Sequence, residues 1–438
     1  MVGGRPALKL VPSRIQAGPP PRRGEQPCDN ATFIPWAECG IVRRAFIGSA
    51  LSPTRFITHL SLIGFATALS TRAVDPIIPP ISEALQTDAA RVALLTTAFT
   101  LPFVLAQPIM GPLADAIGKL RMMRACLVVI IAMSFACALA PSFELLVLAR
   151  IVCGAATGGI YPVGMAIISD AVPLEQRQVG IARWLAIVVT GNLLGTAVSG
   201  VLSDLFGWRA VFLGVGLCAI AAFANALVNL RNAPQAPPTR LDLASIPGRY
   251  LAILANPRAK FCFLAVFLEG VAIFGLFSFV ALLLVAAGET RASIAGVVIA
   301  GFSVGGIAYT LAVTPLTRLW KPRQLMIGGG ALCAASFAGI ALDPAWQIQI
   351  VLFFVMGIGF YTLHGCIQVE ASELSTTARG TAMSMHSLMF FLGHAVGPVL
   401  YGLGFAWLGS NLAVALGGVV VMLTGLMCAR YLTGRPNG

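Results

Sequence analysis

The chain has 438 residues, a formal net charge of +12 and a mean hydropathy of +0.87. Only 11% of its residues are charged, and 58% are hydrophobic. Soluble proteins carry about 25% charged residues, so this composition excludes a soluble protein and indicates an integral membrane protein. The positive charge does not indicate nucleic-acid binding, because the basic residues lie in the N-terminal tail and in alternate connectors, not on one face.

Residues 1–55 contain several arginines and three consecutive prolines but no long apolar run. We predict that they form a disordered, basic cytoplasmic tail, with a start codon assigned too early as the alternative. Twelve apolar segments follow, each near the length of about 20 residues that a helix needs to cross a bilayer. The predicted spans are 56–80, 91–113, 121–140, 143–171, 180–204, 209–230, 261–287, 292–317, 323–342, 346–370, 379–405 and 411–432.

The basic residues follow the positive-inside rule when both termini are placed in the cytoplasm. All but five of the 29 Lys and Arg residues then fall in cytoplasmic segments or near cytoplasmic helix ends. The five exceptions are Arg72, Arg91, Arg150, Arg209 and Arg291. An inverted topology would place the majority outside, so we predict cytoplasmic N and C termini.

The longest connector, residues 231–260, is rich in proline and separates six spans from six. The two sides also repeat, because a shift of 202 positions places Gly191 on Gly393 and Gly195 on Gly397. We therefore predict an all-α membrane protein with twelve transmembrane helices in two pseudo-symmetric six-helix halves. The predicted parts are an N-terminal half at 56–230, a cytoplasmic linker at 231–260, a C-terminal half at 261–432 and a cytoplasmic tail at 433–438.

The charged loop between the second and third spans has the sequence GPLADAIGKLRMMR at residues 111–124. Its glycines allow a tight turn between helix ends, and its basic residues favour the cytoplasmic face. The pattern G-x-L-x-D-x-x-G-[RK] in this loop resembles the signature loop of the major facilitator superfamily. The matching residues are Gly111, Leu113, Asp115, Gly118 and Lys119.

Two further phrases, FLEGVAIFGLFSF and FYTLHGCIQVEASELSTTARGTAMS, look like bacterial efflux permeases of the 12-span drug:proton antiporter branch, which includes arabinose-efflux-like members. The resemblance implies the major facilitator fold and proton-coupled efflux of small molecules or drugs across the bacterial inner membrane by alternating access. A proton symporter that imports a sugar or organic anion is the alternative, and a non-transporting membrane receptor is a more remote one. The implied partners are protons, a small-molecule substrate and the lipid bilayer, with the chain acting as a monomer. No phosphate-binding loop is present, and we expect no enzymatic activity and no cofactor.

Charges inside membrane spans are costly and mark functional candidates. Arg72 and Asp75 lie in the first span and Arg150 lies in the fourth, at a similar depth from the outer end. Asp75 is expected to pair with Arg150 across helices or with Arg72 at i,i+3. In drug:proton antiporters of the family, an acid on helix 1 and an arginine on helix 4 take part in proton coupling, and Asp75 with Arg150 resembles them. A structural ion pair near the outer rim is the alternative.

Glu269 is the one acid inside the seventh span and lies near the membrane midplane. It is a candidate for binding a cationic substrate or for a second protonation site, and a protonated acid with one hydrogen bond is the alternative. Other candidates for the substrate cavity are Asn192, Gln107, His394 and Phe274. The histidines of spans ten and eleven are expected to line the pore or to bond between helices, and no metal site is expected. The cysteines lack C-x-x-C spacing and are predicted to be free thiols.

A cytoplasmic gate is expected where the signature loop meets the second half. Its candidate residues are Gly111, Asp115, Gly118, Lys119, Arg121, Glu370, Glu373 and Arg379. Acids near a helix C-terminus are unfavourable unless they are paired, so Arg379 is the expected partner of Glu370 and Glu373. The resemblance implies that Asp115 lies against the start of helix 11. A solvated loop is the alternative.

Small residues in the fifth and eleventh spans predict close helix packing. They are Gly191, Gly195, Gly200, Gly393, Gly397, Pro398 and Gly402. The set resembles the G-x-x-x-G-P-x-x-G-G motif on helix 5 of exporters in the family. Thr196 and Ser199 depart from that motif in the fifth span, and this departure weakens the inference of antiport over symport.

Overall fold

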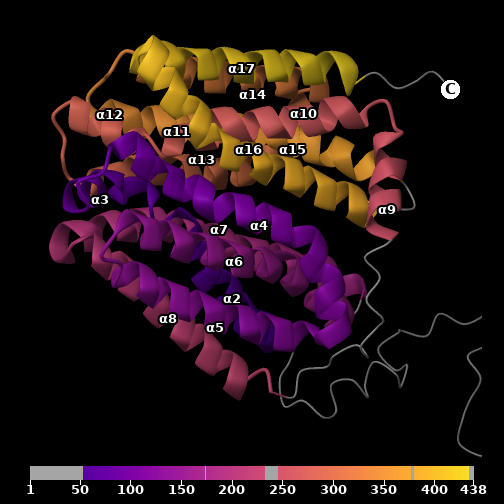
Figure 1. Cartoon of the computed structure of the whole chain (residues 1–438). Helices are drawn as coiled ribbons and strands as arrows, with labels where there is room; N and C mark the ends of the chain where they lie inside the picture. Colours follow the sequence, from indigo (N-terminus) through magenta and orange to yellow (C-terminus); the bar gives the residue numbers. More distant parts are fainter. Residues whose placement is uncertain (1–52, 173, 232–244, 376–378, 434–438) are drawn as a thin grey trace, which may run out of the picture. The chain divides into compact units, whose positions relative to one another are not determined.

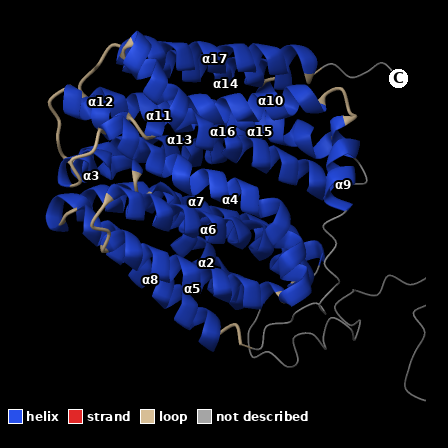
Figure 2. Ribbon diagram, in the orientation of Figure 1, coloured by secondary structure: helices blue, strands red, loops and turns tan. Residues whose placement is uncertain are grey.

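The computed structural model describes residues 53–172, 174–231, 245–375 and 379–433 (Figure 1). Nearly all of the predicted tail at 1–55, and all but the first residue of the predicted tail at 433–438, lie outside these ranges. Within them, every regular element is a helix (Figure 2). The prediction of an all-α protein is confirmed for the described residues.

The first half of the chain forms long helices joined by short turns. Its elements are α2 (Pro53–Arg72), η2 (Asp75–Ile77), α3 (Ile78–Ala84), α4 (Ala89–Ile117), α5 (Lys119–Ala138), α6 (Phe143–Ala171), α7 (Leu174–Phe206) and α8 (Trp208–Val228). The linker contributes one helix, α9 (Ser245–Leu254). The second half consists of α10 (Ala259–Glu269), η3 (Gly270–Phe274), α11 (Gly275–Phe277), α12 (Val280–Ala286), α13 (Ala292–Leu319), α14 (Pro322–Ile340), α15 (Trp346–Glu373), α16 (Arg379–Leu408) and α17 (Ser410–Tyr431).

The two halves pack their helices in corresponding pairs. In the first half, α4 contacts α6, α5 contacts α8 and α2 contacts α7. In the second half, α13 contacts α15, α14 contacts α17 and α10 contacts α16. Between the halves, α7 packs against α13 and α4 packs against α16. The same pattern of helix pairs therefore occurs in both halves, as the sequence repeat predicts, and the two halves are pseudo-symmetric.

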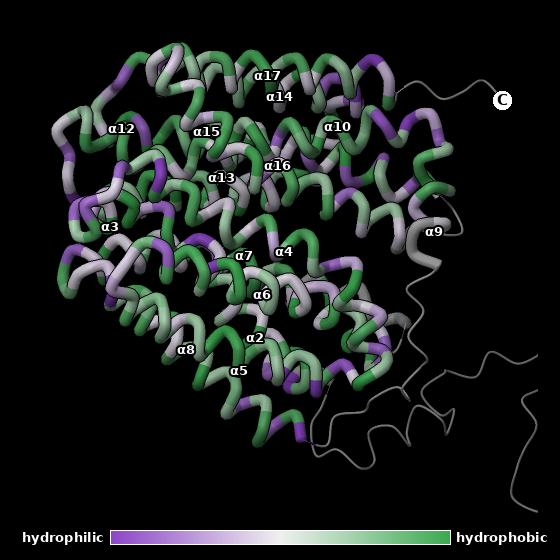
Figure 3. Tube along the Cα trace, viewed as in Figure 1, coloured by the Kyte–Doolittle hydropathy of each residue, from purple (hydrophilic) through white to green (hydrophobic). Residues whose placement is uncertain are grey.

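Ten of the described helices are long and apolar enough to cross a membrane. The two expected spans outside this set are α2 and α14, whose ends carry polar residues: α2 ends at Arg72, and α14 begins with Pro322, Arg323 and Gln324. Apolar side chains such as Leu105, Leu311 and Trp407 are exposed on helix surfaces, as a lipid-facing surface requires. Figure 3 shows this apolar character along the helices, with hydrophilic residues gathered toward several helix ends.

The first predicted span, 56–80, is not one continuous helix. Its α-helix ends at Arg72, and a 3₁₀ turn begins at Asp75 before α3 resumes at Ile78. Pro76 is the second residue of that turn, and Pro79 stands near the start of α3. Prolines have no amide hydrogen to donate, so they favour helix starts over helix interiors, and the break follows from this segment's own sequence.

The seventh predicted span, 261–287, is also interrupted. A π-helical turn, η3, follows α10 directly after Glu269, and the helix breaks again between Phe277 and Val280. Glycines of this segment lie against glycines of α16: a Cβ on Gly397 would meet Gly275 Cα at 2.6 Å and Val271 O at 2.7 Å. The close approach of α16 is therefore possible only because both surfaces lack side chains there.

One helix of the second half takes its N-terminal cap from the first half. The N-cap residue of α13, Arg291, makes no side-chain cap bond. Instead, Asp204 near the end of α7 accepts hydrogen bonds from the backbone N–H groups of Ala292 and Ser293, both at 2.9 Å. A carboxylate at a helix N-terminus satisfies free donors and the helix dipole, so this contact ties α7 to α13.

The packing of α16 on the interrupted seventh span yields a prediction with an internal control. Gly397→Ala should destabilise the protein by about 1–3 kcal/mol, because the new methyl group has no space against Gly275 and Val271. Gly402→Ala gains the same helix propensity but meets only Phe279 Cζ, at an ordinary 3.7 Å. Thermal unfolding followed by size-exclusion fluorescence in detergent compares the two variants, and equal melting temperatures would contradict the packing described.

Candidate functional site

Asp75 lies at the meeting of the two halves and is almost completely buried, with 1% of its surface exposed. Its Oδ2 accepts a hydrogen bond from Arg72 Nη1 at 3.3 Å, within the ion pair of these residues. Its Oδ1 accepts from Thr96 Oγ1 on α4 at 3.1 Å and from Ser278 Oγ, between α11 and α12, at 3.4 Å. The carboxylate is therefore bonded to both halves of the protein.

Arg72 connects Asp75 to residues of the second half. Its Nη2 donates to His394 Nδ1 on α16 at 3.0 Å. The guanidinium carbon also lies 4.5 Å from the ring centre of Phe274 and 5.4 Å from that of Phe277. A carboxylate from its own half, together with an imidazole and two aromatic rings from the other, thus surrounds one buried cation.

Arg150 does not pair with Asp75 in this structure. Its side chain is 1% exposed, its Nη1 donates to Ser70 O at 3.1 Å, and its guanidinium lies 4.1 Å from the ring centre of Phe99. Its Nε and Nη2 have no hydrogen-bond partner among the described residues. Of the two partners considered for Asp75, the structure therefore pairs it with Arg72 and leaves Arg150 a buried cation with free donors.

Glu269 forms a second buried polar group, at the last residue of α10. It is 0% exposed, and its Oε2 is 2.8 Å from His364 Nδ1 on α15. Its other oxygen, Oε1, has no partner in the described part of the chain. The π-helical turn that begins at the next residue is a feature that often accompanies functional sites.

Histidines and phenylalanines fill the space between the two acids. The ring of His394 stacks on Phe274 with centres 3.9 Å apart, and Phe390 lies 4.4 Å from His394 and 4.8 Å from His364. The ring of His386 is 5.0 Å from that of His364. Phe390 therefore contacts both the histidine bound to Arg72 and the histidine bound to Glu269.

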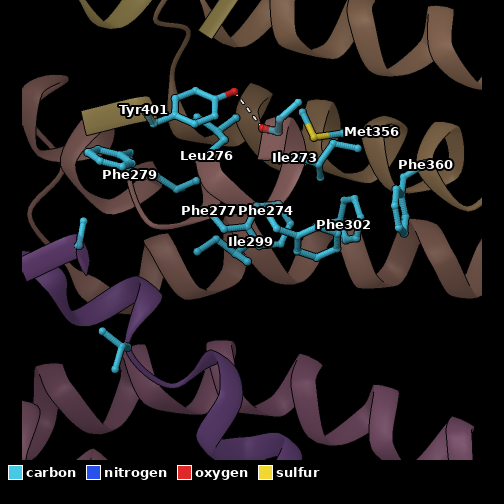
Figure 4. Packing of buried hydrophobic residues seen from close by; sticks show 14 of the residues in the cluster. Ile273, Phe274, Leu276, Phe277, Phe279, Ile299, Phe302, Met356, Phe360 and Tyr401 are labelled. Carbon is cyan, nitrogen blue, oxygen red and sulfur yellow. Dashed lines mark hydrogen bonds between the residues drawn. The ribbon is translucent and has the colours of Figure 1, made fainter. Parts of the chain in front are cut away.

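The aromatic cluster extends away from the histidines into the core of the second half (Figure 4). Phe302 lies 5.5 Å from Phe274 and 5.3 Å from Phe360, and all three are buried. Tyr401 of α16 donates from its hydroxyl to Ala272 O at 2.9 Å. Phe274, predicted as a cavity residue, thus packs between this core and the Arg72 guanidinium.

The two remaining cavity candidates lie on helices of the first half. Asn192 on α7 is half-buried, and its Oδ1 has no partner among the described residues. Gln107 on α4 is also half-buried. Neither side chain makes a hydrogen bond to Asp75 or Glu269 in the described ranges, so their assignment to the cavity stays a prediction.

The signature loop forms its ion pairs within the first half. Lys119 Nζ lies 3.2 Å from Asp115 Oδ1 and 2.5 Å from Asp170 Oδ2, near the end of α6. Gly118 has φ +99°, a conformation that favours glycine, and it lies directly between α4 and α5. Gly111 lies inside α4, and a Cβ there would meet nothing within 4 Å, so the prediction that it allows the turn is wrong. Arg121 is exposed.

One of the two acids at the end of α15 has a partner other than the expected Arg379. Glu370 Oε2 lies 3.6 Å from Arg258 Nη1, just before α10. Glu373 is exposed. The expected partner, Arg379, begins α16, but its side chain lies outside the described residues.

The predicted packing glycines, with the exception of Gly402, lie at close helix contacts. A Cβ on Gly191 would meet Phe65 O and one on Gly195 would meet Leu69 O, each at 2.8 Å, where α7 packs on α2. Gly200 faces the start of α13, and Gly393 faces Gly270. Gly402, by contrast, has only one ordinary contact, and Pro398 lies inside α16.

Several residues of the site carried no usable sequence signal. Thr96 and Ser278 are small hydroxyl residues in apolar spans, and such residues commonly bond to their own helix backbone. His364, by contrast, is among the histidines expected to line the pore or to bond between helices, and its 2.8 Å contact with Glu269 joins α15 to α10. Asp170 and Arg258 lie near predicted helix ends, where charges are ordinary, so only the folded structure identifies them as partners. The eight cysteines in the described ranges are free, and no group of three potential metal ligands occurs there.

Comparison with known proteins assigns this architecture to a family. The family model described as Major Facilitator Superfamily matches residues 60–398, and a second match covers residues 289–438. The chain belongs to the major facilitator superfamily. It is a multi-pass membrane transporter and not an enzyme.

Individual relatives are distant but cover most of the chain. Multidrug resistance protein 1 of Bacillus subtilis (strain 168) is 23% identical over 346 residues, covering 78% of this chain and 87% of that protein. Quinolone resistance protein NorA of Staphylococcus aureus (strain COL) is 24% identical over 378 residues, covering 84% and 95%.

Solved structures agree in fold. A bacterial homologue of the human lysosomal transporter Spinster, in an inward-facing and unoccupied conformation, aligns with a TM-score of 0.72 at 18% identity, covering 89% of this chain and 100% of that one. A D-xylose–proton symporter aligns with a TM-score of 0.70 at 13% identity, covering 86% and 97%. At these identities the likeness establishes the major facilitator fold alone.

Proposed function

We propose that this chain is a proton-coupled exporter of small molecules in the bacterial inner membrane, working by alternating access of its two halves. The observation that carries the proposal is the buried Asp75–Arg72 pair, which is hydrogen-bonded to both halves. Buried ionisable groups in a membrane protein are costly to retain without a function. The multidrug and quinolone resistance proteins among the relatives support export as the direction of transport.

The coupling step follows from the chemistry of the pair. A proton that binds Asp75 removes its negative charge and leaves the Arg72 guanidinium without its ion-pair partner. The bonds between the halves at this level then weaken, and a different packing of the halves becomes favourable. Arg150 has free donors and is the second cation that a displaced, ionised Asp75 would meet.

The orientation belongs to the same proposal. The excess of basic residues in the connectors on one side favours cytoplasmic termini. With that orientation, the end of the bundle that holds Asp75, α3 and the start of α13 faces away from the cytoplasm. The basic end, with Lys119 and Arg258, faces the cytoplasm.

Glu269 is proposed as the group that attracts a cationic substrate. Its Oε1 is a buried acceptor without a partner, and the rings of Phe274, Phe360 and Phe390 lie in the same histidine-containing cluster. A carboxylate beside aromatic faces is suited to an aromatic or lipophilic cation. A second protonation site remains the alternative role for this residue.

A proton symporter is the second candidate function. Thr196 and Ser199 stand in α7 where the exporter motif has a proline and a glycine. The backbone at Thr196 packs closely against Gly296 of α13, where a Cβ added to Gly296 would lie 2.6 Å from Thr196 O. Export and import differ in the direction of proton movement relative to substrate, so a single flux measurement separates them.

The Asp75 role predicts a split between two kinds of transport. Asp75→Asn should abolish uphill transport of ethidium driven by a proton gradient, because the site no longer changes charge. Exchange of ethidium across the membrane without a gradient should persist, since the substrate site is intact. Both are measured in proteoliposomes containing equal amounts of folded protein. Uphill transport that persists in Asp75→Asn would remove Asp75 from the coupling role.

The Glu269 role predicts selectivity by substrate charge. Glu269→Gln should weaken transport of cationic ethidium by about tenfold or more, equivalent to about 1.4 kcal/mol, because the site loses its negative charge. Transport of neutral chloramphenicol should change little. Initial rates over a range of concentrations give the comparison, and an equal loss for both compounds would reject the cation-binding role.

A further inference from the structure

Among the described residues, three hydrogen bonds join the halves at the level of Asp75. Arg72 Nη2 donates to His394 Nδ1 at 3.0 Å, and Ser278 Oγ donates to Asp75 Oδ1 at 3.4 Å. Thr97 Oγ1 on α4 donates to the backbone oxygen of Ala395 at 2.7 Å. Two of these bonds thus end on neighbouring residues of α16, His394 and Ala395.

We propose that His394 is a second proton acceptor of the coupling site, and that a proton on its Nδ1 releases α16 from α2. The proposal rests on the proton-coupled transport proposed above and adds a residue to its mechanism. We call the three hydrogen bonds at this level the bridge. The proposal follows from which of their groups are able to donate and which are able to accept.

The Arg72–His394 bond fixes the protonation state of the histidine. A guanidinium has N–H donors and no acceptor, and it stays protonated in proteins. His394 Nδ1 must therefore accept with its lone pair, which makes the ring neutral and leaves its proton on Nε2. His394 is 4% exposed, and Nε2 has no hydrogen-bond partner among the described residues.

A proton at Nδ1 is incompatible with this bond. The new N–H bond would occupy the lone pair that accepts from Arg72, and an imidazolium would then face a guanidinium in a buried site. The bond breaks, the like charges repel, and α16 loses its contact with the end of α2. The proton comes from water on the side of the membrane to which the site is open, and no other covalent bond changes.

The groups around His394 define what else responds to a proton. Arg72 faces it directly from α2, and Asp75 of η2 lies behind Arg72. On α15, His364 is reached through Phe390, and it is bonded to Glu269 at the end of α10. Thr97 is the neighbouring polar contact from α4 and does not titrate.

The bridge therefore has two places at which a proton acts with the same result. On Asp75 a proton removes the carboxylate that holds Arg72 from its own half, and on His394 it removes the acceptor that holds Arg72 from the other half. The bonds from Ser278 and Thr97 have no titratable donor. His394 is thus the single titratable partner that the second half contributes to these three bonds.

Spin-label distances across this end of the protein test the proposal without a substrate. Labels replace Glu83 on α3 and Trp407 on α16, both exposed, in a chain whose native cysteines are substituted. Double electron–electron resonance in nanodiscs from pH 5 to pH 9 then reports the separation of α16 from the first half. The background keeps Asp75, because Asp75→Asn would itself mimic the protonated acid and release Arg72 from its own half.

The expected result is a longer distance at low pH. His394→Asn should move this transition to lower pH and make it less steep, because the amide oxygen accepts from Arg72 and takes up no proton, which leaves Asp75 as the one titratable partner of Arg72 in the bridge. His394→Phe should give the long distance at every pH, since the ring remains and the acceptor is lost. His386→Asn, a buried histidine of the same helix, should leave the shift intact. His394→Gln replaces the asparagine variant if that one fails to fold.

Either of two outcomes overturns the proposal: a pH profile that His394→Asn leaves unchanged, or no shift at all in the chain that keeps both Asp75 and His394. The first would assign the response to another group, such as the Glu269–His364 pair. Failure of the transport proposal gives a different pattern, namely a His394-dependent shift without any proton-driven flux. Proton-driven flux with a shift that does not depend on His394 rejects only the role of His394.

Discussion

The buried guanidinium of Arg72 is the charge around which this protein is arranged. Removing a cation from water costs several kcal/mol unless the surroundings replace its hydration, and here three kinds of group do so. They are the Asp75 carboxylate, the His394 ring nitrogen and the faces of Phe274 and Phe277. Because these groups come from both halves, the stability of the charge depends on how the halves are packed.

Interruptions of regular helix place these groups. The first span breaks after Arg72, so Asp75 begins a 3₁₀ turn and faces Arg72, Thr96 and Ser278. The seventh span changes to a π-helical turn after Glu269 and breaks again around Ser278. Glycines on both sides let α16 approach this irregular segment closely, which brings His394 against Phe274. The irregular backbone is tolerated at membrane depth because it is buried within protein.

The contacts of Arg72 join the two halves. At the charged end of the bundle, by contrast, the described ion pairs join helices of the same half. Lys119 contacts Asp115 and Asp170, and all three belong to the first half. Between the halves, the polar contacts described lie toward the end with α3 and the start of α13, including the cap from Asp204. A transporter that rocks its halves must break contacts at one end while making them at the other. We propose that the Arg72 bridge is the contact in this set that a proton acts on.

Much of the fold was predictable from the sequence, because hydropathy and helix length constrain a membrane protein strongly. Hydropathy predicts the helical class, the shift of 202 positions predicts the two-half repeat, and glycine spacing predicts close helix contacts, which the structure shows at every named glycine except Gly402. The predicted spans do not include the interruptions at Pro76 and Gly270, because a hydropathy pattern does not report local hydrogen bonding. The prolines after Asp75 explain the first break, but they do not by themselves locate it within a span. At the site, charges inside spans identified Asp75, Arg72 and Glu269, but depth alone left Arg72 and Arg150 as equal partners for Asp75. The preference for Arg72 depends on a helix break that places the two residues face to face.

We propose that proton entry drives substrate export through the Asp75–Arg72 pair. The most direct measurement is proton flux in proteoliposomes that enclose a pH-sensitive dye, with drugs and sugars added in turn to the unmodified protein. Antiport predicts that a transported compound evokes proton movement opposite to its own. Movement of proton and compound in the same direction would contradict export and make this transporter an importer.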